Sequence, residues 1–98
     1  MKLNTNNFYE TISEGIVLVK FEASWCGPCK AYTPIFKEFA SENESVKCFS
    51  VDCQEEADLA ADFDIKSIPV TILFKHGEEQ QRLPGKLSKD QLLKLISE

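Results

Sequence analysis

The chain has 98 residues, of which 43% are hydrophobic, so it is long enough for one compact domain and too short for two. Its net charge of −5 argues against non-specific binding to nucleic acid or anionic membranes and favours proteins as partners. No run of about twenty apolar residues could span a bilayer, and no signal peptide is visible at the start. We therefore expect one cytoplasmic domain covering residues 1–98, working as a monomer.

In chain order, the pattern first predicts a short helix and a central strand. Thr5, Asn6 or Asn7 can cap the helix, with Glu10 three residues after Asn7 as a capping-box partner and Gly15 as the end of the helix. Residues 16–21 are apolar at nearly every position, which is typical of a strand covered on both faces.

A longer helix and a second buried strand are expected next. From Ala31 onward apolar residues recur at helical spacing, up to a predicted end between 41 and 44, and Pro34 should kink this helix. Residues 46–51 read as a buried strand. Because a helix connects it to the first strand, the two should be parallel and the crossover right-handed.

The second half predicts a short helix, a hairpin and a final helix. The short helix covers 55–62, and strands at 70–74 and 79–83 flank a turn at His76 and Gly77. Ser88 and Gln91 should cap the last helix, which carries Leu92, Leu93 and Ile96. The fold class is therefore α/β, with a mixed sheet of about four to five strands and helices on both faces.

The segment WCGPCK, residues 25–30, lies between the first strand and the longer helix. Two cysteines three positions apart at a helix start lie within one turn, so Cys26 and Cys29 can form a switchable disulfide. Unpaired N–H groups and a partial positive charge favour thiolate at Cys26, the expected nucleophile, while Cys29 lies deeper and acts second. Pro28 suits the first helical turn, and Gly27 allows tight turning and close approach by another chain.

Other readings of the cysteines are less favoured. A zinc site using Cys48 and Cys53 would need both pairs on exposed turns, whereas Cys48 lies in a predicted core strand. A purely structural disulfide fits poorly with a CxxC beside a βαβ pattern. We expect Cys48 to behave as a small core residue, Cys53 to be exposed and open to glutathionylation or dimerisation, and His76 to be a turn residue.

The CGPC motif after a buried strand, a proline in Ser67-Ile68-Pro69 before a hairpin, and the order of elements together resemble the thioredoxin family over the whole chain. The resemblance implies the thioredoxin fold and a dithiol–disulfide reductase acting on proteins. It implies no bound cofactor: the redox-active disulfide is Cys26–Cys29, recharged with electrons from NADPH by a flavin-containing thioredoxin reductase.

The resemblance also implies roles for individual residues. Cys26 matches the attacking cysteine and Cys29 the resolving one, with Trp25 beside them. Pro28 matches the residue that tunes the redox potential, and Pro69 the cis-proline that faces the dithiol. A flat apolar patch for protein substrates is implied at Trp25, Gly27, Ile68 and Gly85.

The sequence departs from the family beside the motif. Lys20 stands where an aspartate is usual, and Ser50 where many members have its lysine partner. Lys20 and Glu22 share a strand face, so Glu22 could supply part of the missing carboxylate function, with Lys20 as ion partner and stabiliser of the Cys26 thiolate. In the alternative, Lys20 reaches water, Glu22 is a surface residue, and water takes the Cys29 proton. Gln54 replaces another aspartate, but its amide can still accept a hydrogen bond from Trp25.

Two function classes remain after this reading. One is a general protein disulfide reductase, and the other is a thioredoxin-fold binding or scaffold subunit whose redox activity is secondary. The intact CGPC with both Trp25 and Pro69 favours the first. The Gly-Pro pair between the cysteines also favours a reductase over the histidine-containing motifs of oxidising relatives.

Overall fold

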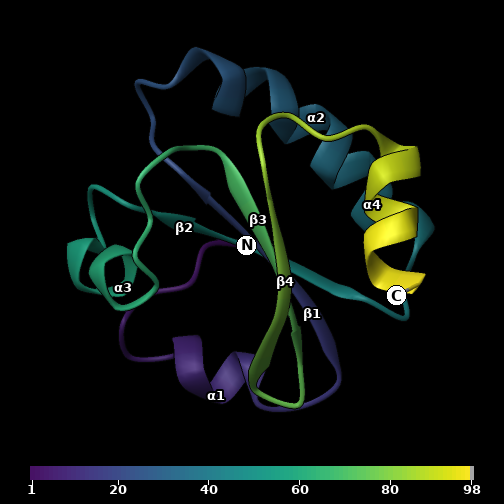
Figure 1. Ribbon diagram of the computed structural model, residues 1–98, viewed down its shortest axis with the longest axis horizontal. Coiled ribbons are helices and arrows are strands. Elements are labelled where there is room, and N and C mark those ends of the chain that lie inside the picture. Colours follow the sequence, from purple (N-terminus) through teal and green to yellow (C-terminus); the bar gives the residue numbers. More distant parts are fainter. Residues whose placement is uncertain (98) are drawn as a thin grey trace.

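The computed structural model describes residues 1–97 and places a four-stranded sheet between two layers of helices (Figure 1). In the view of Figure 1, α1 and α3 lie below and to the left of the sheet, and α2 and α4 lie above and to the right. The elements in chain order are α1 (Phe8–Ile12), β1 (Ile16–Glu22), α2 (Gly27–Glu42), β2 (Lys47–Asp52), α3 (Ala57–Asp62), β3 (Val70–Lys75), β4 (Glu78–Pro84) and α4 (Lys89–Ser97).

The sheet is mixed, with strand order β2-β1-β3-β4. β1 runs parallel to β2 and antiparallel to β3, and β3 and β4 form an antiparallel hairpin. The expected mixed sheet and the parallel pairing of the first two strands are confirmed. Before α1, Lys2 adds a parallel bridge to Ser50 on the outer side of β2.

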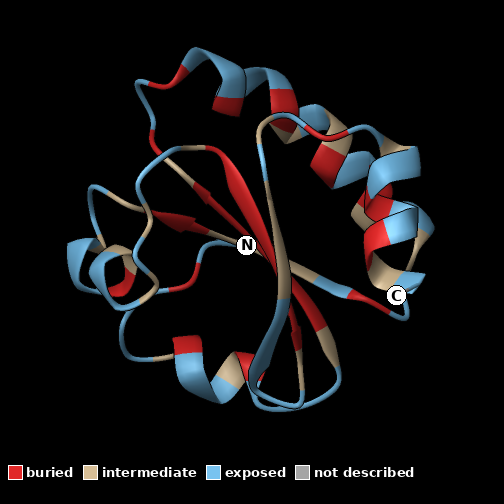
Figure 2. Ribbon diagram, viewed as in Figure 1, coloured by how far each residue is buried: buried red, intermediate tan, exposed pale blue. Residues whose placement is uncertain are grey.

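Successive side chains of β1 point to opposite faces of the sheet, so the interior is divided into two cores. Val17, Val19 and Phe21 pack with side chains of α1 and α3, whereas Leu18 packs on the other face with side chains of α2 and α4. Figure 2 shows the buried residues along the central strands and on the helix faces turned toward them. Because β1 is covered on both faces, its carboxyl end is a rigid platform for the segment that follows it.

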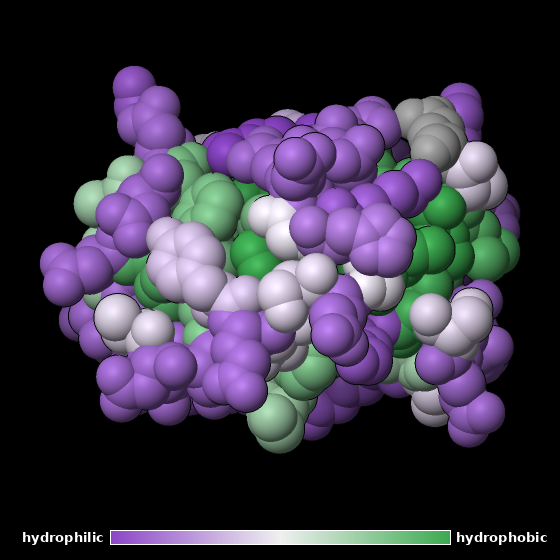
Figure 3. Space-filling model, turned by 90° about the horizontal axis from the view of Figure 1, so that it is seen from below, coloured by the Kyte–Doolittle hydropathy of each residue, from purple (hydrophilic) through white to green (hydrophobic). Residues whose placement is uncertain are grey.

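The described chain presents a largely polar exterior. Hydrophilic side chains cover most of the end seen in Figure 3, with hydrophobic patches showing between them. None of the helices within residues 1–97 is long and apolar enough to cross a membrane.

The start of α1 differs from the expectation, and that of α2 agrees with it. Asn7 precedes α1, but its side chain makes no capping bond to the helix, and the capping box with Glu10 is wrong. The side chain of Asn4 accepts hydrogen bonds from the N–H groups of Asn6 and Asn7 instead, and so shapes the entry turn. α2 begins at Gly27, within the motif as expected, and the side chain of Cys26 caps it; the apolar pattern of the helix follows from Ala31.

The later elements follow the expectation with local shifts. α3 begins at Ala57, two residues late, since the Asp52 carboxylate accepts the N–H groups of Gln54 and Glu55 and holds them in a turn. The capping box of α4 is confirmed: the Ser88 N–H donates to the Gln91 side chain, and the Gln91 N–H donates to the Ser88 hydroxyl. The apolar face of α4 buries Leu92 and Leu95, whereas Leu93 is exposed.

Candidate active site

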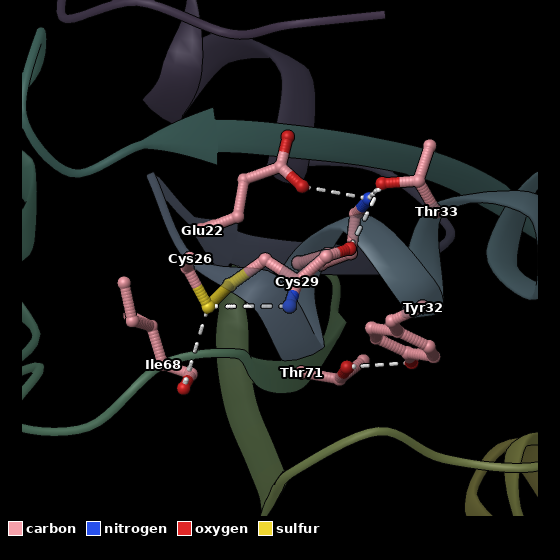
Figure 4. A network of polar contacts seen from close by, with 8 residues as sticks. Glu22, Cys26, Cys29, Tyr32, Thr33, Ile68 and Thr71 are labelled. Atoms are coloured by element: carbon pink, nitrogen blue, oxygen red, sulfur yellow. Dashed lines mark hydrogen bonds and ion pairs between the residues drawn. A yellow bond between two sulfur atoms is a disulfide. The ribbon is translucent and has the colours of Figure 1, made fainter. Parts of the chain in front are cut away.

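Cys26 and Cys29 lie where β1 ends and α2 begins, and the structure joins them in a disulfide (Figure 4). Their Cα atoms are 5.2 Å apart, within the range that a disulfide allows. Cys26 is the N-cap of α2, and its Sγ accepts a hydrogen bond from the N–H of Cys29 at 3.2 Å. The first helical turn contains Pro28, whose missing N–H would have had no partner there. This arrangement stabilises negative charge on the Cys26 sulfur.

The exposure of the motif follows the expected gradient. The side chain of Trp25 is 69% exposed, while Cys26 is 5% and Cys29 only 1% exposed. Gly27 and Pro28 are both exposed beside them. In residues 1–97 no hydrogen bond joins Trp25 to the exposed Gln54, so the expected indole contact is absent from this structure.

Two loops from the second half of the chain complete the site. The Ile68–Pro69 peptide bond is cis, as the resemblance implied, and the Ile68 carbonyl oxygen lies 4.0 Å from the Cys26 Sγ. Ile68 also packs against the small cluster that contains both cysteines. The N–H of Gly85 donates to the Pro69 carbonyl at 2.8 Å, which ties the loop after β4 to the cis-proline loop.

A buried ion pair lies behind the dithiol. The Nζ of Lys20 is 2.8 Å from Oε1 of Glu22, and the two side chains are only 3% and 17% exposed. The expected ion pair is therefore present, and the alternative in which Lys20 reaches water is wrong. The ammonium also lies over the rings of Tyr32 and Phe36, at 5.7 and 5.2 Å from their centroids, which favours a cation at this position.

Thr33 connects this pair to the resolving cysteine. Lys20 Nζ donates to Thr33 Oγ1 at 3.1 Å, and Thr33 Oγ1 donates to the Cys29 carbonyl at 3.0 Å (Figure 4). The sequence reasoning missed Thr33. Its signal was a hydroxyl residue four positions after Cys29, which places both on one side of α2.

A cavity of about 250 Å³ opens beside Cys29. Among its lining residues Glu22 alone carries a carboxylate. Glu22 and Thr33 also line a second cavity of about 420 Å³ on the Lys20 side. Both cavities open to solvent, so the site can hold water next to Cys29 and next to a carboxylate.

The other two cysteines lie outside the dithiol, although Cys48 lines the cavity on the Lys20 side. Both are half-buried, so the expectation that Cys53 is exposed is wrong: it packs against the core between β1 and α3. Burial raises the pKa of Cys48 to about 11 and that of Cys53 to about 11. The part of the chain that the structure describes has no cluster of three potential metal ligands.

Comparison with known proteins agrees with the geometry. The sequence profile of the family described as thioredoxin matches residues 1–98. The chain belongs to the thioredoxin family. Relatives include the thioredoxin of Chlamydia trachomatis, 42% identical over 97% of this chain and 93% of that protein. The thioredoxin of Staphylococcus haemolyticus is 36% identical over 98% of this chain and 93% of that protein.

A solved structure confirms the fold. It comes from a study of the thiol-resolving mechanism of a yeast mitochondrial 1-Cys peroxiredoxin through glutathione and thioredoxin systems. That chain superimposes with a TM-score of 0.90 at 26% identity, over 99% of this chain and 92% of its own. With the family and the cysteine pair established, the protein is an oxidoreductase that reduces disulfides in other proteins.

Proposed function

We propose that Cys26 is the attacking thiolate and Cys29 the resolving thiol. The observation that carries this assignment is the hydrogen bond from the Cys29 N–H to the Cys26 Sγ, at the N-cap of α2. A thiolate at that atom is stabilised by the N–H and by the helix end. Cys29 is 1% exposed and Cys26 is 5% exposed, so Cys29 is the less accessible of the two to a protein substrate.

The reaction then runs in two exchanges. The Cys26 thiolate attacks one sulfur of a substrate disulfide, the S–S bond breaks, and the other substrate sulfur leaves as a thiolate. Next the Cys29 thiolate attacks the Cys26 Sγ, which forms the intramolecular disulfide and releases the second substrate thiolate. Two electrons pass from the dithiol to the substrate, and the released thiolates take up protons.

Glu22 is the group that receives the proton of Cys29. It is the carboxylate of the cavity beside Cys29, and water in that cavity can relay the proton over the intervening distance. Lys20 orients Glu22 through their ion pair and orients the first turns of α2 through Thr33. The buried ammonium also favours negative charge on the nearby sulfurs.

The substrate lies across the exposed surface next to Cys26. Trp25, Ile68 and Gly85 would form this surface, and Pro69, which is buried, would shape the backbone beneath it. Gly27 would allow a close approach of the substrate backbone, and Pro28 would tune the redox potential of the pair. The Ile68 carbonyl, 4.0 Å from the Cys26 Sγ, is placed to pair with an extended substrate segment.

The reduced form is regenerated by a partner. We assign this role to a flavin-containing thioredoxin reductase that takes electrons from NADPH, because the only redox group proposed for this chain is the Cys26–Cys29 disulfide. The protein works as a single-domain monomer in the cytoplasm, with disulfide-containing proteins as substrates.

A trapping experiment tests the assignment of the cysteines. The Cys29→Ser variant should accumulate a mixed disulfide between Cys26 and a substrate, which intact-protein mass spectrometry followed by peptide mapping identifies. Cys26→Ser should form none, and Cys48→Ser, a matched control for loss of a thiol, should resolve it as the wild type does. The assignment would be contradicted if Cys26→Ser formed a mixed disulfide on Cys29 as fast as Cys29→Ser forms one on Cys26.

A kinetic experiment tests Glu22. In Glu22→Gln, resolution of a preformed mixed disulfide should be slower by about a hundredfold, while the first attack keeps its rate. The fluorescence of Trp25, the chain's one tryptophan, follows both steps in a stopped-flow instrument. An unchanged resolution rate and pH profile would remove Glu22 from the mechanism and leave water as the acceptor.

A further inference from the structure

The surface around the dithiol differs in charge from the rest of the chain. Three segments border the site: residues 23–30, 66–69 and 84–87. Together they carry Lys30, Lys66 and Lys86 and no Asp or Glu, in a chain whose net charge is −5. We call these three lysines the lysine rim.

Each member of the lysine rim lies one or two residues from a residue of the site. Lys30 follows Cys29 directly in the first turn of α2. Lys66 lies two residues before Ile68, whose carbonyl is 4.0 Å from the Cys26 Sγ. Lys86 follows Gly85, whose N–H bonds to the Pro69 carbonyl. All three are exposed to solvent.

The charges of the lysine rim are little neutralised within residues 1–97. Neither Lys30 nor Lys86 forms an ion pair there. Lys66 Nζ lies 3.9 Å from Asp64 Oδ2, and because both side chains are well exposed this pair contributes little.

Three acidic side chains at or just after the carboxyl ends of β1 and β2 are engaged in contacts of their own. Glu22 is paired with Lys20, and the carboxylate of Asp52 accepts two backbone N–H groups. Glu55 lies 3.7 Å from the Nζ of Lys2. The face that meets substrates therefore keeps a local positive charge.

We propose that the lysine rim selects protein disulfides flanked by Asp and Glu. This inference rests on the proposed function and names the substrate class of the same site. Charges at the edge of an interface act mainly on the association rate, and they exclude partners with like charge. Their reach is about 10 Å at 0.1 M salt, which covers residues on either side of a substrate disulfide.

Two disulfide-bonded peptides that differ only in flanking residues, Glu in one and Lys in the other, test the proposal. For each peptide, the rate at which it oxidises the reduced protein is divided by the rate at which it reacts with mercaptoethanol. This ratio removes the effect of the flanking residues on the reactivity of the disulfide itself. At low ionic strength the Glu peptide should react about tenfold faster. The negative charge of the whole chain would give the opposite preference, so the sign of the ratio separates local from overall charge.

Paired variants locate the effect. Lys66→Ser with Lys86→Ser should reduce the preference to about twofold. Lys47→Ser with Lys94→Ser removes the same amount of charge at exposed positions elsewhere, on β2 and α4. This control variant should keep most of the preference for the Glu peptide. Lys30 stays unchanged because it adjoins Cys29. At about 0.5 M salt the preference should disappear in the wild type.

A disulfide peptide with neutral flanking residues distinguishes failure of the lysine rim from failure of the reductase function. All variants should reduce it at the wild-type rate. The lysine rim would be overturned as a selector if the wild type reduced the neutral peptide normally but showed no preference for Glu flanks. It would also be overturned if both double variants lost the preference equally. Either result would leave the reductase function standing. Failure of the wild type to reduce the neutral peptide would overturn the proposed function, and the rim proposal with it.

Discussion

Lys20 Nζ and Glu22 Oε1 are 2.8 Å apart on one face of β1, so the side chain that breaks the family pattern has its counter-ion two residues away. Glu22 ends β1, and its carboxylate lines the same cavity as the resolving cysteine. Thr33 then ties the ammonium to the Cys29 turn.

The first prediction concerns the stability that this pair provides. Glu22→Gln leaves an ammonium in a site that is 3% exposed, so it should lower the free energy of unfolding by about 3 kcal/mol. The double variant Lys20→Met with Glu22→Gln removes both charges and should regain most of that loss. Urea unfolding of the oxidised proteins measures each value.

The double variant also provides the control. If it is as unstable as Glu22→Gln, the loss comes from packing and hydrogen bonds rather than from an unpaired charge. That outcome would contradict the account in which Glu22 stabilises the fold by neutralising the buried Lys20.

The second prediction concerns a buried hydrogen bond across the core. Tyr32 Oη and Thr71 Oγ1 are 2.8 Å apart, and both residues are fully buried (Figure 4). Thr71→Val leaves the phenol without a partner and should cost about 2 kcal/mol of unfolding free energy. Adding Tyr32→Phe should restore part of it, and a double variant that is less stable than Thr71→Val would contradict this account.

The third prediction concerns the stability of the fold at alkaline pH. Burial raises the pKa values of Cys48 and Cys53 to about 11, above that of an unfolded thiol near 9.0. Between these values the unfolded chain loses protons that the folded chain keeps, so the stability present below pH 9 should fall as the pH rises toward 11. Unfolding of wild type against a Cys48→Ala, Cys53→Ala variant across this window measures the difference.

Thiol labelling checks the same pKa values directly. In the oxidised protein only these two thiols can react, and their labelling by iodoacetamide should accelerate up to about pH 11. Labelling that levels off below pH 9 would show that neither thiol is buried as the structure places it.

The fourth prediction separates two glycines of the site. Gly85 has φ of +88°, which an L-residue adopts only with strain, although a Cβ there would touch nothing. Gly85→Ala should therefore cost about 1–2 kcal/mol. Gly27 lies in the first turn of α2 with open space around it, and Gly27→Ala should change stability little. Equal losses for the two variants, measured by thermal unfolding, would contradict the conformational explanation.

The sequence predicted best where one physical rule dominates. The uninterrupted apolar run of β1 indicated a central strand, and the CGPC segment after it indicated a dithiol at a helix start; both are found. The motif indicated where α2 begins, but not that the side chain of Cys26 caps the helix, because cysteine seldom has that role. Thr33 escaped notice because its importance depends on where a strand residue, Lys20, places its ammonium. Leu95 rather than Leu93 faces the core because the packing of α4 against α2 sets its rotation.

The most direct test of the central claim is NADPH oxidation coupled through a thioredoxin reductase, with insulin as the disulfide substrate, comparing wild type with Cys29→Ser. The account predicts sustained turnover in the wild type and none in the variant, because the variant cannot release the mixed disulfide. Absence of turnover in the wild type, with reductases from several sources, would contradict it. Such a result would mean that Lys20 has disabled or redirected the site, and it would favour a binding or scaffold role for this fold.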